Sequence, residues 1–342
     1  MAKSSKKNGS KQNESAKGGS KPQYAAAIDL GGTKVLAAIV DENHTILATA
    51  KIKTDVGGGA ESVIAQMAAG VLKAAKKAKI NAADLVAVGA CAPGPVNPAT
   101  GIVSRAVNLG WTEPVALGEL LGKALGGIPV FVENDVNAGV YGSVVAGVAK
   151  GKQDVVGIFV GTGIGGGLVL DGKLRRGARW GAGELGHSII MADGPVCGCG
   201  NRGCIESLAS RTALERDLRL ALDAGRESII TELMGGKDGR MTSGVIAAAL
   251  DADDPLMTEL MGRSNRYLGL FTASIVNILD PEMVVFGGGV VEKLGDAMLD
   301  PIRTVAEANY LQKEGKVEIV AAHLSDNAAI IGVAALAREA YG

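Results

Sequence analysis

The sequence predicts an α/β protein of two lobes, and three observations support that prediction. The chain has 342 residues with apolar residues spread evenly along it, which is more than one hydrophobic core comfortably holds. A glycine-rich turn between two apolar strands occurs once in each half, at 29–34 and at 161–167. Short buried strands and apolar helical stretches accompany both turns. We therefore expect two α/β lobes, each with its own core, and a cleft between them.

The first 23 residues differ in composition from everything that follows. Segment 1–23 holds six lysines against Glu14 and almost no apolar residue, so it cannot bury enough surface to offset the entropy of ordering it. We predict a disordered basic tail that serves as a solubilising extension. A basic arm that contacts nucleic acid or acidic lipid is the alternative that this composition leaves open.

The charge and hydropathy of the remaining chain exclude several classes of protein. Outside the tail, 29 basic and 35 acidic residues make the body mildly acidic, which argues against a broad nucleic-acid-binding surface. The tail lacks the apolar core of a secretory signal. The longest apolar run, 155–170, contains six glycines and is shorter than the roughly 20 residues that span a membrane. We expect a soluble cytoplasmic protein with no membrane or nucleic-acid partner.

In the first half of the chain, strands, turns and helices follow one another in order. Segments 24–28 and 35–40 are predicted strands on either side of the turn at 29–34. Apolar residues then recur at helical spacing between Ile64 and Ala75. The further elements expected here are a strand at 85–90 that ends in the turn at 92–95, a loop at Asn108, a strand at 130–132 and a buried helix over 138–149.

The second half opens in the same way as the first. A strand at 155–160 leads into the glycine turn at 161–167 and a strand at 168–170, which Asp171-Gly172 closes. Farther on, Asp254-Pro255 predicts a helix start with proline at the first helical position, and we expect that helix to run to about Asn277. The last predicted elements are a strand at 283–286 that ends in the glycines 287–289, and a closing apolar helix over 327–341.

Asp135 is the candidate catalytic residue. It follows Glu133 and Asn134 at the end of a predicted strand, which is where open α/β sheets bind their ligands. An isolated Asp at such a position is usually a helix N-cap, so both roles are possible. The two glycine turns and the polar side chains of Asn108, Glu184 and Glu206 favour a site where a hydroxyl compound meets a phosphate donor.

The two glycine turns are candidate phosphate-binding loops. Peptide N–H groups in such turns bind phosphate, because glycine lets the backbone approach closely. The second turn also fits the dinucleotide pattern through Gly161, Gly163 and Gly166, so a nicotinamide-dependent dehydrogenase is an alternative. That pattern requires a helix to begin at the glycines, whereas a hairpin is predicted here. A dehydrogenase is therefore disfavoured.

His187, Cys197, Cys199 and Cys204 have the composition of a structural zinc site. One imidazole and three thiolates complete a tetrahedral set and leave no position for water, so the zinc would be structural. The intervening glycines suit a chain that bends around an ion; reduced thiols in a loop are the alternative. Such a metal would hold Glu184 and Glu206, three residues before His187 and two after Cys204, near one place, where their carboxylates suit sugar hydroxyls.

These motifs together resemble the ROK family (repressor, open reading frame, kinase), and the resemblance covers the chain from about Tyr24 to the end. It rests on Asp-Leu-Gly-Gly-Thr-Lys at 29–34, Glu-Asn-Asp-Val-Asn-Ala at 133–138, the glycines of 161–167, Gly-Glu-Leu-Gly-His at 183–187 and Cys-Gly-Cys-Gly-Asn-Arg-Gly-Cys-Ile-Glu at 197–206.

The resemblance implies an actin-like ATPase fold, related to hexokinase and ribonuclease H, with mixed sheets in both lobes. The implied division is a small N-terminal lobe over 24–132, joined by the C-terminal helix at 327–342, and a large lobe over 133–326 that carries the zinc motif and the nucleotide site. The family also implies a homodimer or homotetramer.

Family roles carry over residue by residue. Asp135 takes the position of the catalytic base, and His187 is both a sugar contact and a zinc ligand. The other sugar contacts are Asn108, Asn134, Glu184 and Glu206. The phosphate and nucleotide positions are Asp29, Gly31, Gly32, Thr33, Lys34, Gly161, Thr162, Gly163, Gly287, Gly288 and Gly289. The implied cofactors are ATP, Mg²⁺ and structural Zn²⁺.

The implied activity is ATP-dependent phosphorylation of glucose at its 6-hydroxyl. Asn108-Leu109-Gly110-Trp111 resembles the glucokinase branch of the family more than the fructokinase branch. Mannose, fructose, N-acetylmannosamine and N-acetylglucosamine remain alternative substrates, polyphosphate an alternative donor, and a non-catalytic sugar sensor an alternative function. Repressors of this family carry an N-terminal helix-turn-helix domain, which 23 polar residues cannot form.

Overall fold

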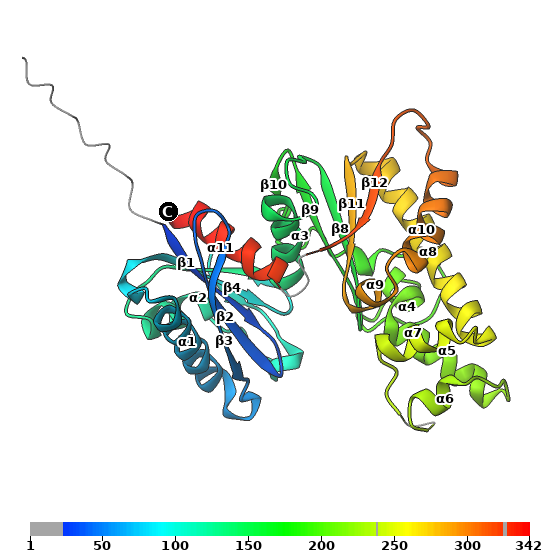
Figure 1. Ribbon diagram of the computed structural model, residues 1–342, viewed down its shortest axis with the longest axis horizontal. Coiled ribbons are helices and arrows are strands. Elements are labelled where there is room, and N and C mark those ends of the chain that lie inside the picture. The colour runs from blue at the N-terminus through cyan, green and yellow to red at the C-terminus, as the bar shows by residue number, and fades with distance from the viewer. Residues whose placement is uncertain (1–22, 237–238, 324–326) are drawn as a thin grey trace, which may run out of the picture.

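The computed structural model describes residues 23–236, 239–323 and 327–342, and two five-stranded sheets organise them (Figure 1). The predicted tail at 1–23 lies outside the described residues except for Gln23. In spatial order the first sheet consists of β3 (Ile46–Lys53), β2 (Lys34–Val40), β1 (Tyr24–Leu30), β4 (Leu85–Ala92) and β7 (Val130–Asn134). Strands β3, β2 and β1 are antiparallel, and β1, β4 and β7 are parallel.

The second sheet repeats this arrangement. Its spatial order is β10 (Lys173–Leu174), β9 (Ile164–Leu170), β8 (Val155–Val160), β11 (Met283–Gly287) and β12 (Glu318–Ala321). Strands β10, β9 and β8 are antiparallel, whereas β8, β11 and β12 are parallel. The predictions of an α/β fold with mixed sheets, and of a second half that opens like the first, are confirmed. Below, "small lobe" and "large lobe" denote the parts of the chain built on the first and second sheets.

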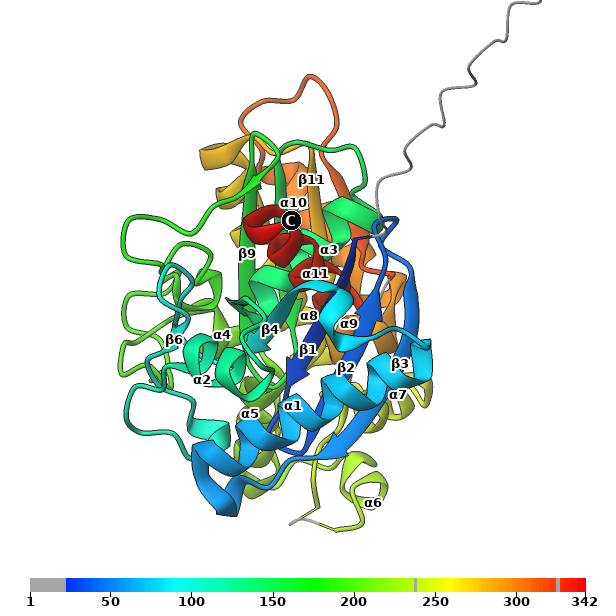
Figure 2. The same cartoon turned by 90° about the vertical axis from the view of Figure 1, so that its left-hand side faces the viewer.

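Alternate residues of the small-lobe strands pack on opposite faces, as the period of two in a strand requires. Ala26 and Ile28 of β1 face helices α1 (Gly59–Ala78) and α2 (Leu117–Ala124), whereas Ala25 and Ala27 face helix α11 (Asn327–Tyr341). Figure 2 looks onto the small lobe and shows α1 crossing in front of the strands. The remaining elements of this lobe are β5 (Val96–Asn97), β6 (Ile102–Val103) and the short 3₁₀ helices η1 (Val56–Gly58), η2 (Ala82–Asp84) and η3 (Val107–Leu109).

One face of the large-lobe sheet is covered by helices that come mainly from the second half of the chain. They are α4 (Ile205–Ala209), α5 (Arg211–Asp223), α6 (Ile230–Leu233), α7 (Ser243–Asp251), α8 (Pro255–Leu279), α9 (Gly289–Leu294) and α10 (Asp296–Asn309), and η4 (Leu185–His187) precedes them. The buried Asp254 caps α8 as predicted, because its carboxylate accepts a hydrogen bond of 2.7 Å from the N–H of Met257.

Helices α3 (Asp135–Ala146) and α11 lie between the two sheets and pack against each other (Figure 1). Their contact is close because glycines face the partner helix: a Cβ atom on Gly332 would lie 1.9 Å from the carbonyl oxygen of Ala138, and one on Gly142 would lie 2.0 Å from that of Ala328. The predicted closing helix is therefore present, and it holds the helix that begins at Asp135.

Several predicted boundaries are wrong, and two of these errors affect residues next to Asp135. The glycine turn at 161–167 is confined to 161–163, because β9 begins at Ile164 and contains the other three glycines. A side chain at Gly165 or Gly166 would meet Val136 or Leu185 at 2.6 and 2.5 Å. These glycines thus serve packing on the sheet face. Helix α3 begins at 135 and not at 138, because the preceding residue, Asn134, caps it.

Among the described residues, no helix is long and apolar enough to cross a membrane.

The contact between α3 and α11 predicts opposite effects for two glycine-to-alanine changes. Gly332→Ala should lower the free energy of unfolding by about 1–3 kcal/mol, because the added methyl group overfills the contact. Gly262 is an exposed residue inside α8, and a Cβ there meets nothing within 4 Å. Gly262→Ala should therefore raise stability by up to about 1 kcal/mol through helix propensity. Urea unfolding of both variants measures this, and equal effects would contradict the close packing.

Candidate functional site

The carboxyl ends of three parallel strands meet at one edge of the small-lobe sheet. Asp29 in β1 is level with Cys91 in β4, which in turn is level with Glu133 in β7. Burial raises the pKa of the Cys91 thiol well above its usual range, and the carboxylates of Asp29, Asp135 and Glu133 add to that shift. Three carboxylates therefore surround one buried point at the edge where such sheets bind ligands.

Asn134 and Asp135 form the junction between β7 and α3. The side-chain oxygen of Asn134 accepts hydrogen bonds from the N–H groups of Val136 (3.0 Å) and Asn137 (3.1 Å), so Asn134 is the helix N-cap. Its side-chain nitrogen donates to the carbonyl oxygen of Gly94 at 3.3 Å. The capping role that the sequence left open for Asp135 therefore belongs to its neighbour, and Asp135 is the first residue of α3.

The surroundings of Asp135 shift the pKa of its carboxyl group. Burial raises its pKa above the usual range, and the nearby carboxylate of Glu184 adds to the shift, whereas the hydrogen bond of 2.9 Å from the N–H of Val136 acts the other way. A carboxylate with a raised pKa takes up a proton more readily near neutral pH.

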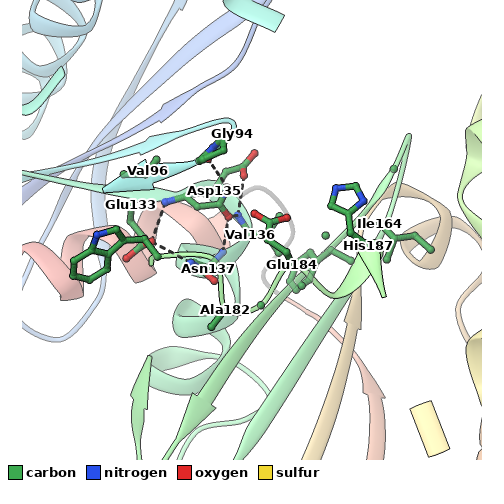
Figure 3. A pocket seen from close by; sticks show the side chains of 18 of the residues that line it. Gly94, Val96, Glu133, Asp135, Val136, Asn137, Ile164, Ala182, Glu184 and His187 are labelled. Atoms are coloured by element: carbon green, nitrogen blue, oxygen red, sulfur yellow. Dashed lines mark hydrogen bonds between the residues drawn. The ribbon is translucent and has the colours of Figure 1, made fainter. Parts of the chain in front are cut away.

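A cleft of about 440 Å³ opens beside Asp135 and is lined by residues from both lobes. Asp135, Glu184 and His187 project into it from separate elements (Figure 3). Glu206 of α4 and the turn at 161–163 complete its large-lobe side. The cleft thus combines carboxylates, an imidazole and exposed peptide groups, which suit a polyhydroxyl ligand beside a phosphate.

The turn at 161–163 is held in place from the large lobe. The N–H of Gly161 donates to the carbonyl oxygen of Gly163 at 2.9 Å. The buried Arg211, at the start of α5, donates to Thr162 Oγ1 at 2.6 Å and to the carbonyl oxygen of Met241 at 2.5 Å. A Cβ on Gly163 would lie 2.3 Å from Glu206 Oε2, so a side chain there would force that carboxylate to shift.

The second glycine cluster follows β11. Gly287 ends the strand, Gly288 has a φ of 88° and Gly289 begins α9. A Cβ on Gly288 would lie 2.5 Å from the carbonyl oxygen of Val160, so the backbone turns close against the end of β8. Gly288 lines the cleft, which places this cluster next to the turn at 161–163.

His187, Cys197, Cys199 and Cys204 come together as one group, with their ligand atoms all within 4.8 Å of one another. Cys197 Sγ lies 3.6 Å from His187 Nδ1, and Cys199 Sγ lies 3.7 Å from Cys204 Sγ. Tetrahedral zinc with bonds of about 2.0–2.3 Å separates its ligand atoms by about 3.3–3.8 Å. Burial raises the pKa of Cys197 to about 12, so a cation would be needed to hold it as a thiolate. The donor set therefore fits zinc.

Glu206 connects this group to the glycine turn. Its Oε2 accepts a hydrogen bond of 2.9 Å from the N–H of Ile164, and its Oε1 lies 3.4 Å from Cys197 Sγ. Because Nδ1 of His187 faces the sulfur atoms, Nε2 is the ring atom left for a ligand in the cleft. The cluster thus positions two predicted sugar contacts.

Comparison with models of known protein families shows to which family this chain belongs. The model of the ROK family matches residues 25–340. The chain belongs to the ROK family.

Relatives of this ROK protein include proteins named as glucokinases and a hexokinase. It is 34% identical to a glucokinase of Streptomyces coelicolor over 91% of this chain and 96% of that protein. Among solved structures, a ROK hexokinase from Thermus thermophilus is 31% identical with a TM-score of 0.81, covering 93% of this chain and 99% of that one. A Streptomyces griseus ROK glucokinase in complex with glucose and AMPPNP is 34% identical with a TM-score of 0.78, covering 92% and 99%. The predicted actin-like kinase fold is thereby confirmed.

ROK regulators are also similar to this chain. A xylose repressor of Caldicellulosiruptor bescii is 30% identical over 77% of this chain but only 65% of the repressor. This chain therefore covers a smaller share of the repressor (65%) than of the Streptomyces coelicolor glucokinase (96%).

Some residues that the sequence predicted to bind the sugar or the phosphates do not line the cleft of this ROK protein. Asn108 is an exposed residue of η3, and its carbonyl oxygen faces Gly32, where a Cβ would lie 2.7 Å away. Asn108 and the turn at 29–34 therefore pack together in the small lobe, outside the lining of the cleft.

Two residues of the ROK site escaped the sequence prediction. Arg211 contacts Thr162, although 49 positions separate them in the sequence, and Arg176 contacts Glu133, which is 43 positions away. An arginine distant in sequence carries no local signal of such a contact. Only Ser210, which caps α5 by accepting a hydrogen bond from the N–H of Ala213, marks a helix start at which Arg211 could have been suspected.

Proposed function

We propose that this ROK protein is an ATP-dependent sugar kinase that phosphorylates glucose at its 6-hydroxyl, with Asp135 as the general base. The observation that supports this most is that Asp135 shares one cleft with the glycine turn at 161–163 and with Glu184 and His187. A base, a phosphate-binding turn and acceptors for hydroxyl groups are what phosphoryl transfer to an alcohol requires.

In this mechanism Asp135 accepts the proton of the sugar hydroxyl while that oxygen attacks the γ-phosphorus, and the bond from the γ-phosphorus to the bridging oxygen of ADP breaks. Asn134, Glu184, His187 and Glu206 hold the other hydroxyl groups and orient the acceptor. Asp29 would hold Mg²⁺, whose charge would neutralise that of the phosphates. Closure of the lobes would bring Asn108 and the turn at 29–34 to the ligands and exclude water.

The turns at 161–163 and 287–289 form the nucleotide side of the proposed site. Gly161, Thr162, Gly163 and Gly288 line the cleft, and their peptide groups lie where the phosphates of ATP would be bound. Thr162 has its hydroxyl held by Arg211, a buried cation that would add positive charge next to those phosphates. Cytoplasmic location and a homodimer or homotetramer remain predictions.

A sugar sensor is the second candidate, because the chain is similar to a xylose repressor as well as to kinases. A panel of glucose, mannose, fructose, N-acetylglucosamine and N-acetylmannosamine with Mg²⁺ and ATP, followed as ADP release, separates the two. We expect glucose to be preferred. Activity confined to another sugar would change the substrate but keep the kinase, and no turnover with any of the five, together with measurable sugar binding, would favour the sensor.

Replacing the base should separate binding from turnover. Asp135→Asn should retain sugar binding but lower kcat by about a hundredfold to ten-thousandfold, since no group then accepts the proton. Burial raises the pKa of Asp135, so ionising it at neutral pH opposes folding, and the neutral variant should be at least as stable as the parent. Calorimetric titration with glucose, thermal unfolding and the ADP assay test this. Near-normal turnover would exclude Asp135 as the base.

The metal cluster predicts a specific loss of zinc. Cys199→Ala should reduce bound zinc from about one per chain to little, and sugar binding should weaken because His187 and Glu206 lose their anchor. Cys91→Ala is the matched control, since Cys91 is buried at the sheet edge and lies outside the cluster. Elemental analysis of purified protein measures the metal. Equal zinc in both variants, or none in the parent, would contradict a zinc site.

A further inference from the structure

The edge strands of the two sheets are joined at the cleft. β7 lies at one end of the small-lobe sheet and β10 at one end of the large-lobe sheet. Arg176, two residues after β10, reaches β7: its Nε lies 2.6 Å from Glu133 Oε2, and its guanidinium carbon lies 5.6 Å from the centroid of the Phe131 ring. Phe131 and Glu133 are two apart in β7, so they share one face of the strand.

The Glu133 carboxylate organises the residues on both sides of Asp135. Its side chain is only 2% exposed. Its Oε1 accepts hydrogen bonds from the N–H of Asn134 (3.0 Å) and from the side-chain nitrogen of Asn137 (3.2 Å). A buried carboxylate of this kind is strongly unfavourable without a cation, because desolvation destabilises the charge. Arg176 supplies the cation that pairs with this buried carboxylate.

The backbone of Arg176 also contacts the segment that carries Glu184, one of the proposed sugar contacts. Its carbonyl oxygen accepts a hydrogen bond of 3.0 Å from the N–H of Ala182, two residues before Glu184. Ala182, Glu184, Glu133 and Arg176 all line the cleft, and Figure 3 shows the first three around Asp135. The backbone of Arg176 thus anchors the segment that carries Glu184, while its side chain anchors the segment that carries Asp135.

We infer that Arg176 is a positioning residue for phosphoryl transfer: its ion pair with Glu133 joins the two edge strands and sets the Asp135 carboxylate relative to Glu184. The inference rests on the proposed kinase function. Arg176 acts through Glu133 and the N-terminus of α3, so its loss should impair the chemical step and leave nucleotide binding unchanged. Displacement of a reacting group by about 1 Å is enough to lower a rate by about a hundredfold.

Steady-state kinetics of Arg176→Met test this. We expect kcat to fall by about tenfold to a hundredfold while KM for ATP stays within about twofold of the parent. Arg176→Lys keeps the charge and should recover part of the loss. Glu133→Gln should reproduce the defect, and Glu133→Gln combined with Arg176→Met should be no worse than the more impaired single variant, because both remove one interaction.

Arg303→Met is the matched control. Arg303 has a similar exposure, 29% against 23% for Arg176, and it also makes ion pairs, with Asp296 and Asp300, but on the outer helix α10. It should leave kcat unchanged. If Arg176→Met and Glu133→Gln both keep the parent kcat, or if every loss appears equally in Arg303→Met, the inference is wrong.

Hydrogen exchange gives a readout that does not depend on turnover. The amides of Asn134, Val136 and Asn137 should exchange about tenfold faster in Arg176→Met or, if that variant does not fold, in Arg176→Lys, and at the parent rate in Arg303→Met. A parent chain without turnover on any sugar would overturn the proposed function alone, and the exchange data would still decide on the positioning of α3. Unchanged exchange in the Arg176 variants would overturn the inference.

Discussion

The start of helix α3 is the point on which the rest of the site depends. There an edge strand ends, Asn134 caps the helix and Asp135 becomes its first residue. A carboxylate at a helix N-terminus is stabilised by the N–H groups of the first turn, yet burial at this junction raises its pKa. These two effects on the pKa of Asp135 oppose each other, and the effect of burial is the larger, which is consistent with the proposed role of Asp135 as a base.

This junction lies where both lobes meet, so its geometry depends on long-range packing. Helix α3 lies on α11, the last helix of the chain, through a contact that Gly142 and Gly332 keep close. On its other side, the glycines of β9 let the large-lobe sheet approach Val136. A Cβ atom at these positions would collide with the facing backbone or side chain, so the packing around α3 requires glycine there. The many glycines of this chain are explained in part by that requirement.

On the large-lobe side of the cleft, a cluster of possible metal ligands lies next to the lining residues. His187 and three cysteines form one cluster, and Cys197 of that cluster contacts Glu206. Glu206 in turn accepts a hydrogen bond from the strand that follows the turn at 161–163. The four donor atoms fit a zinc ion, which would hold the loop that carries the cysteines in place. A single ion would thereby order His187, Glu206 and the turn at 161–163, to which the proposed function assigns sugar and phosphate binding.

Local sequence was enough to predict features that depend on a few adjacent residues. These are the cap and proline at Asp254-Pro255, the strands that flank each turn, the closing helix and the spacing of the metal cluster. It failed for the glycines of β9, because the residues that require them, Val136 and Leu185, come from elsewhere in the chain. It also missed the Arg176–Glu133 pair for the same reason, because 43 positions separate the two residues in the sequence.

The dependence of kcat/KM on pH between about 4 and 8, measured for the preferred sugar at saturating ATP, tests the role of Asp135 most directly. A base must be ionised to act, and burial raises the pKa of Asp135, so activity should fall as the pH drops through an apparent pKa above the ordinary aspartate value of about 3.9. Protein returned to neutral pH should recover full activity, which separates this titration from unfolding. A rate that stays flat down to pH 4 would contradict the account.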